Sequence, residues 1–155
     1  FSSDPAWKKV ARESQVDGKI LAQRPDSVYM KKTSYSPSWK NGKSEKDDVF
    51  ELRVYKAGEG KLGKLDARFR DHTIRIFEKH GMKSVAYWHP LDEPDSKDTL
   101  VYIIKHENRE SAKKSWKGFL ADPEWKKAAQ ASGVGRLAKP PAATYMKPTD
   151  YSAIR

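Results

Sequence analysis

The chain has 155 residues, of which 37% are hydrophobic and 34% charged, and its formal net charge is +10. This composition supports the core of one domain plus a fragment, and there is no apolar stretch of about twenty residues that would cross a membrane. The absence of cysteine excludes disulfides, thiolate metal sites and a cysteine nucleophile. We expect a soluble protein. Composition does not define its compartment, so both a cytoplasmic and an exported protein agree with the sequence.

The positive charge does not form a nucleic-acid-binding patch. It is spread along the chain and never reaches a run of five like charges. The nearest approach to a basic cluster is residues 113–117 (KKSWK), which we expect on the solvated face of a helix. We therefore predict no specific nucleic-acid partner.

The first forty residues repeat the last forty. Residues 1–9 (FSSDPAWKK) correspond to 119–127 (FLADPEWKK), and residues 28–36 (VYMKKTSYS) correspond to 144–152 (TYMKPTDYS). A separation above one hundred residues is typical of tandem domains and not of a short-repeat solenoid. We predict that residues 1–36 are the C-terminal helix (4–15) and strand (27–35) of a truncated first domain. Residues 37–47 are then a linker, and residues 48–155 a complete domain.

The complete domain begins with a strand and a long helix. Residues 48–55 alternate apolar and polar side chains, which predicts a strand, and residues 57–60 form a turn. Residues 61–80 carry an apolar stripe at helical spacing, and Gly81 ends the predicted helix.

The second half of the domain consists of two strands, two helices and a last strand. Strands are predicted at 82–89 and 99–106 around a polar, Pro-rich loop, followed by helices over 108–120 and from residue 123 to Gly133. The last predicted strand covers 143–151. Pro148 lacks an amide donor, so this strand should lie at an edge or stop pairing there.

The order β-α-β-β-α-β predicts an α+β, ferredoxin-like domain with both helices on one face of the sheet. In the strand at 99–106, the apolar residues point both ways: Leu100, Tyr102 and Ile104 to one face, Val101 and Ile103 to the other. A sheet that is wet on one side would alternate more cleanly. We expect a second sheet of the same kind to cover the open face.

Several blocks of this sequence resemble the NIPSNAP family: residues 50–55 (FELRVY), 69–73 (FRDHT), 77–82 (FEKHGM), 122–125 (DPEW) and 145–146 (YM). The resemblance covers 48–155 and, through the repeat, 1–36. It implies a dimeric α+β barrel in which two ferredoxin-like domains, from a homodimer or from an intramolecular domain pair, close their sheets around a shared interior. It implies no assigned reaction.

Two classes of function are consistent with this resemblance. The first is a binding or interaction module with a pocket in the barrel. The second, by analogy with related barrel families, is an enzyme of the cofactor-independent monooxygenase type acting on a small apolar ligand. We predict no cofactor. Residues 58–63 match the spacing of a dinucleotide fingerprint, but a ferredoxin-like sheet has no crevice of the kind that such a fingerprint needs.

Five residues are candidates for the pocket. Arg53 and Tyr55 alternate with the apolar residues of their strand and are expected on the open face, where Arg53 would pair with a carboxylate such as Glu51 or with an anionic ligand. Tyr55 would either add a hydroxyl to the pocket or pack at the interface.

The other three candidates are His72, Trp88 and His89. His72 falls on the apolar stripe of its helix and is expected to point at the sheet, as a core histidine in preference to a base or ligand. Trp88 and His89 end a strand beside a loop, where binding residues often lie. No pair of histidines has the spacing of metal ligands, so no metal site is predicted.

Overall fold

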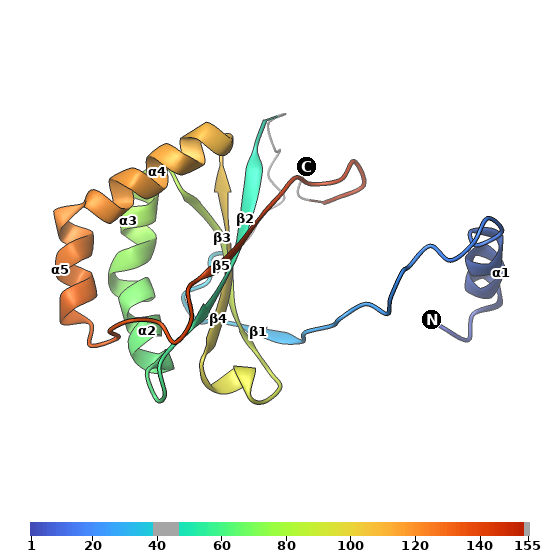
Figure 1. Cartoon of the computed structure of the whole chain (residues 1–155), viewed down its shortest axis with the longest axis horizontal. Coiled ribbons are helices and arrows are strands. Elements are labelled where there is room, and N and C mark those ends of the chain that lie inside the picture. The colour runs from blue at the N-terminus through green and yellow to red at the C-terminus, as the bar shows by residue number, and fades with distance from the viewer. Residues whose placement is uncertain (39–46, 154–155) are drawn as a thin grey trace.

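The computed structural model describes residues 1–38 and 47–153, so residues 39–46 of the predicted linker lie outside the described part. One antiparallel sheet has the strand order β1-β3-β4-β2-β5 (Figure 1). Its strands are β1 (Met30–Lys32), β2 (Val49–Lys56), β3 (Lys83–Pro90), β4 (Thr99–His106) and β5 (Ala142–Met146). Strands β2 to β5 have the ferredoxin-like arrangement that was predicted. β1, from the first repeat, extends this sheet by pairing with β3.

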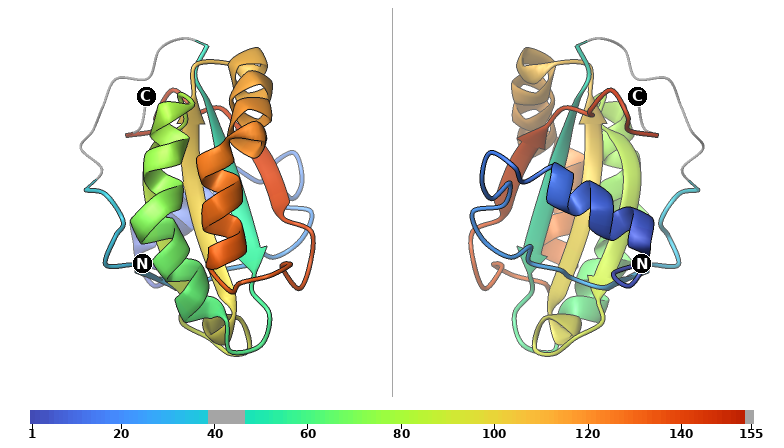
Figure 2. Two further views of the ribbon diagram at one scale, coloured as in Figure 1. Left: turned by 90° about the vertical axis from the view of Figure 1, so that its left-hand side faces the viewer. Right: turned by 90° about the vertical axis from the view of Figure 1, so that its right-hand side faces the viewer.

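Two helical segments lie side by side over one face of the sheet (Figure 2, left). The first runs through α2 (Leu62–Arg68), a π-helical turn (Phe69–Thr73) and α3 (Ile74–Lys79); the second consists of α4 (Arg109–Ala121) and α5 (Pro123–Ala131). A 3₁₀ turn (Asp95–Lys97) lies between β3 and β4. Among the described residues, no helix is long and apolar enough to cross a membrane.

The hydrophobic core lies between the sheet and these helices. As predicted, Leu100, Tyr102 and Ile104 share one face of β4, and all three are fully buried there. The helices contribute a second apolar layer to the same core: Leu65, Phe69, Ile76, Phe77 and Phe119. Burying each large side chain is worth about 1.5–3 kcal/mol. The core is thus built from residues of the second repeat.

The prediction for the faces of β2 is wrong. Glu51, Arg53 and Tyr55 are paired with Ile104, Tyr102 and Leu100 of β4 and therefore point toward the helices. The open face instead carries the half-buried side chains of Leu52, Val54, Ile103 and Trp88. The polar Glu51 and Arg53 lie on the helix side of β2 and the apolar Leu52 and Val54 on the open side, so the alternation of β2 predicted the opposite assignment.

The prediction for His72 is also wrong, because its side chain is exposed. The π-helical turn Phe69–Thr73 adds one residue to the helical repeat. This extra residue shifts the buried position from 72 to 73. Thr73 is 1% exposed, and its hydroxyl donates to the carbonyl of Arg68 at 3.1 Å.

Helix α1 (Pro5–Glu13) stands apart from the sheet, on the side opposite to α2–α5 (Figure 1; Figure 2, right). None of its residues is buried, although an isolated nine-residue helix is marginal in water. Its local geometry matches that of its repeat partner α5. The rings of Phe1 and Trp7 are 4.5 Å apart at 33°, and those of Phe119 and Trp125 are 4.4 Å apart at 34°.

The last strand is shorter than predicted. β5 stops pairing with β2 at Met146, two residues before Pro148, and it lies at an edge of the sheet. Both observations agree with the missing donor of Pro148. The chain then turns away on the open side of the sheet (Figure 1).

Candidate functional site

The two repeats meet in a pocket at one end of the sheet. The first-repeat segment 31–35 crosses the end of β3 beside α2, and the pocket between them has a volume of about 570 Å³. Because β1 pairs with β3, Lys31 lies directly opposite His89. We call this the inter-repeat pocket; its lining includes Lys31, Lys32, Thr33, Ser34, Tyr35, Asp66, Arg70, His89 and Ser96.

Three side chains form a hydrogen-bonded group in this pocket. The Tyr35 hydroxyl donates to Oδ1 of Asp66 at 2.6 Å, and Nε2 of His89 lies 3.0 Å from the same oxygen. Tyr35 comes from the first repeat, Asp66 from α2 and His89 from β3. A carboxylate that holds one ring nitrogen of a histidine also fixes the orientation of the ring. The group therefore needs residues from both repeats.

The Tyr35 hydroxyl is held in its protonated form. Burial raises the pKa of Tyr35 well above its ordinary value, and the hydrogen bond and negative charge of Asp66 raise this pKa further. The ring also packs against Tyr87 at 5.6 Å. Tyr35 is thus an anchor that donates a hydrogen bond at neutral pH and is not a base.

The rest of the pocket lining is cationic and rich in hydroxyls. Lys31, which shares the face of His89, has no ion-pair partner among the residues that the structure describes, whereas Lys32 shares the open face with Trp88. Arg70 is held by Asp71 through two hydrogen bonds of 2.7 and 2.8 Å. Asp66 is the one carboxylate in the described lining, and it already has two partners. The pocket is therefore suited to a small anion.

Arg53 belongs to a different site, buried beneath α4. Its Nη1 donates to Oε1 of Glu51 at 2.5 Å, so the internal pairing considered from the sequence is confirmed. Its guanidinium also stacks 4.2 Å from the ring of Trp116. Oε2 of Glu51 accepts from Trp116 at 2.7 Å and lies 2.9 Å from Nε2 of His106.

These hydrogen bonds determine the ionisation of Glu51. Burial alone would raise the pKa of its carboxyl, but the hydrogen bonds from His106, Trp116 and Arg53 outweigh it and lower the pKa. The Glu51 site is a structural network in the core, since both carboxylate oxygens are occupied by the protein itself, although Nε of Arg53 and Nδ1 of His106 are buried without a partner among the described residues.

The five candidates are not brought together. Tyr55 packs edge-on against Tyr102 and Phe69 in the core, at 5.2 and 5.9 Å. Trp88 lies on the open face, whereas His89, the next residue, points into the inter-repeat pocket. Of the five, His89 lines the pocket where the repeats meet.

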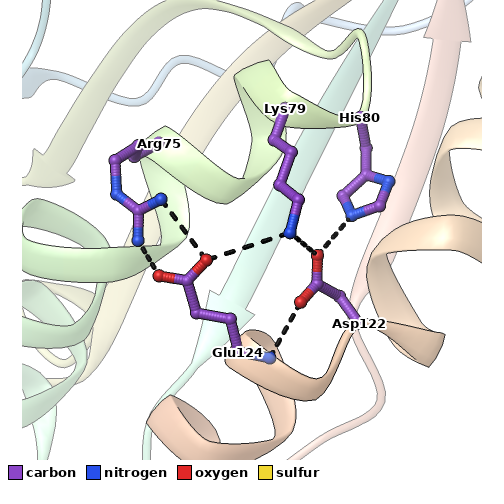
Figure 3. Close-up of polar contacts among 5 residues, drawn as sticks. All are labelled: Arg75, Lys79, His80, Asp122 and Glu124. Carbon is purple, nitrogen blue, oxygen red and sulfur yellow. Dashed lines mark hydrogen bonds and ion pairs between the residues drawn. The ribbon is translucent and has the colours of Figure 1, made fainter.

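A second polar cluster links α3 to α5 (Figure 3). Asp122 caps α5 by accepting from the amide of Glu124 at 2.8 Å, and its other oxygen lies 2.8 Å from Nζ of Lys79 and 2.7 Å from Nε2 of His80. These bonds, that of Lys79 first, lower the pKa of Asp122 to about 2. The ring of His80 leaves no room for a side chain at Gly118, where a Cβ would lie 2.7 Å from Nδ1. These contacts hold the C-terminal end of α3 against the N-terminal end of α5.

No group of three or more His, Asp or Glu side chains within residues 1–38 and 47–153 is arranged to hold a metal ion. The chemistry that the inter-repeat pocket offers is hydrogen bonding and charge from lysine, histidine, tyrosine and serine.

The comparison with known families supports the resemblance found in the sequence. The sequence model of the NIPSNAP family matches residues 50–153. The chain belongs to the NIPSNAP family. This match covers the ferredoxin-like domain, including Asp66 and His89 of the inter-repeat pocket.

Solved structures of NIPSNAP proteins share the fold. An uncharacterised NIPSNAP-like domain protein from Burkholderia xenovorans is 18% identical, with a TM-score of 0.60 over 70% of this chain and 90% of its own. Two NIPSNAP family proteins from Agrobacterium tumefaciens are 19% and 18% identical, with TM-scores of 0.60 and 0.61. Both matches cover 70% of this chain. They cover 95% of the first protein's own chain and 99% of the second's. No curated protein sequence matches this chain.

Proposed function

We propose that this NIPSNAP chain is a binding module that works as a pair of domains and holds a small anionic ligand in the inter-repeat pocket. The observation that carries the proposal is the composition of that pocket. Lys31, unpaired within the described part of the chain, lies opposite His89 and beside one carboxylate that Tyr35 and His89 already occupy. A carboxylate or phosphate monoester would find charge from Lys31 and hydroxyl donors from Ser34 and Ser96.

Pairing of two domains is supported by the open face of the sheet. Leu52, Val54, Ile103 and Trp88 lie there half-buried, with α2–α5 on the opposite face. A second sheet of the same kind, from another copy in a homodimer or from an intramolecular partner domain, would bury them. Residues 1–36 are then the end of that partner domain, and a small apolar ligand between the sheets is a further prediction of the same arrangement.

Calorimetric titration tests the binding proposal. Inorganic phosphate, phenyl phosphate and benzoate are the probes, and benzyl alcohol is the uncharged control. We expect saturable binding of the anions that weakens as salt rises from about 50 to about 200 mM, because Lys31 is exposed and its charge is screened. Replacing Lys31 by Met should weaken binding about tenfold or more, the loss of one charge-assisted hydrogen bond.

The matched control is Lys127→Met, which removes an exposed lysine from α5 and leaves the pocket unchanged. His89→Ala should also weaken binding. Equal affinity in the Lys31→Met and Lys127→Met chains, or no saturable binding by any of the three anions, would contradict the proposal.

A further inference from the structure

The segment that follows β5 has the same sequence pattern and the same turn as the segment that follows β1. Residues 146–152 (MKPTDYS) correspond to residues 30–36 (MKKTSYS). The amide of Ser36 donates to the carbonyl of Thr33 at 3.3 Å, and the amide of Ser152 donates to that of Thr149 at 3.0 Å. We call residues 146–152 the tail. It is folded locally as its first-repeat counterpart is.

The first-repeat segment is docked in a groove between β3 and α2. The amide of Thr33 donates to the carbonyl of Tyr87 at 3.0 Å, and the amide of Tyr87 donates to Oγ of Ser36 at 2.9 Å. Thr33 is buried, and Tyr35 reaches across to Asp66 of α2. We call this the β3/α2 groove.

In the tail, the tyrosine that corresponds to this anchor is exposed to solvent. Tyr151, the counterpart of Tyr35, is 83% exposed. The tail leaves the sheet on the open side, the side on which α1 stands (Figure 1). There residues 147–149 lie beside Phe50 and Ile103 of the open face. A preformed turn with an exposed tyrosine, next to an apolar face that is only partly covered, is typical of a docking segment without its receptor.

We infer that the tail docks in the β3/α2 groove of a second domain of the same kind, with Tyr151 in the place of Tyr35. For this chain, that domain is a second copy. The exchange displaces residues 30–36 of the second copy and forms a second version of the inter-repeat pocket, in which Lys147 replaces Lys31 and Asp150 replaces Ser34. Because of Asp150, the second pocket carries less positive charge than the first. The inference rests on the proposed pairing of domains.

Pro148, which stands where the first repeat has Lys32, is compatible with this docking. In the observed pairing, Thr33 bonds to Tyr87 and Tyr29 accepts from the amide of Leu91. Because hydrogen-bonded and non-hydrogen-bonded pairs alternate along antiparallel strands, the Lys32 pair with Trp88 between them is a non-hydrogen-bonded one. The amide of residue 32 therefore points away from β3. A proline at this position loses no bond of the ladder.

Photo-crosslinking of the full chain tests the inference. A benzophenone amino acid replaces Tyr151, and isotopically heavy and light copies are mixed so that links between molecules are recognised by mass. We expect position 151 to link to residues 63–70 or 83–91 of the other copy. The resident Tyr35 competes for the same groove, so Tyr35→Ala should raise the yield several-fold.

The same crosslinker at position 35 is the control, and it should reach the same two segments within its own molecule. Links from position 151 confined to its own chain, or directed to other segments of the second copy, would overturn the inference. So would failure of the position-35 control, because the groove would then be misplaced. Light scattering separates this outcome from failure of the pairing: a stable dimer without links from 151 to the groove removes the tail inference alone.

Discussion

The Glu51 network makes the sharpest prediction for stability. Glu51→Leu removes both oxygens that serve Arg53, Trp116 and His106. The Arg53 side chain is only 14% exposed, so its charge is left without a partner in the core. Breaking a buried ion pair in this way costs about 3–5 kcal/mol. This is a large part of the roughly 5–15 kcal/mol that stabilises a domain.

Urea unfolding followed by circular dichroism measures the effect. With an m-value of about 1–3 kcal/mol/M, the midpoint should fall by about 1 M or more. Glu59→Leu, at an exposed turn position, is the matched control and should change the unfolding free energy by less than about 0.5 kcal/mol. A Glu51→Leu chain with the midpoint of the control would refute the claim that Glu51 and Arg53 form a buried ion pair.

A double-mutant cycle identifies the cause of the loss. Replacing an ion pair by two apolar residues is often nearly neutral, so Arg53→Met should recover part of the stability lost in Glu51→Leu. The recovery is partial because Trp116 and His106 still lack their acceptor, at about 1–3 kcal/mol for each buried donor. If the costs of the two single substitutions simply add, the Arg53 charge is not coupled to Glu51 and the account fails.

Two further predictions concern the helices. In urea unfolding, His72→Ala should change the unfolding free energy by less than about 0.5 kcal/mol. Thr73→Val, which removes the buried hydroxyl, should lower it by about 1 kcal/mol. Equal effects of the two substitutions would contradict the π-helical turn. Because hydrogen bonds lower the pKa of Asp122 to about 2, its contribution to stability is complete above its ordinary pKa of 3.8 and is lost as the pH falls toward 2. Asp122→Ala should therefore lower the thermal midpoint at pH 7 and flatten its fall between these two pH values, and a variant with an unchanged acid profile would exclude this role.

The sequence predicted the order of elements because the alternation of β4 and the caps at Asp122 and Gly81 act locally. It did not predict which side of β2 faces the helices. That choice depends on the register with β4 and on the pairing of Arg53 with Glu51, which allows the more polar side of β2 to be buried. The error at His72 has the same origin. A one-residue π-helical insertion depends on tertiary packing and has no signature in the apolar spacing.

The inter-repeat pocket was only partly predictable. His89 was found from its place at a strand end, and Tyr35 was visible as one of the residues that the two repeats share. Asp66 gave no signal, because its role arises only when α2 is packed beside the segment that follows β1. In the sequence, Lys31 and Arg70 are indistinguishable from other surface charges. Only the fold brings them to the same pocket.

The repeat and the pocket are linked by one physical argument. β1 makes a strand of only three residues, too short to hold its place by pairing alone. Its position is secured by the next residues of the chain, because Thr33 and Tyr35 are inserted into the second-repeat domain. Because residues 31–35 and the domain on which they dock belong to one chain, the pocket depends on this docking and not on a second copy. Ligand binding and docking of residues 31–35 should consequently strengthen each other, since a ligand that binds only the formed pocket stabilises the docked segment by mass action.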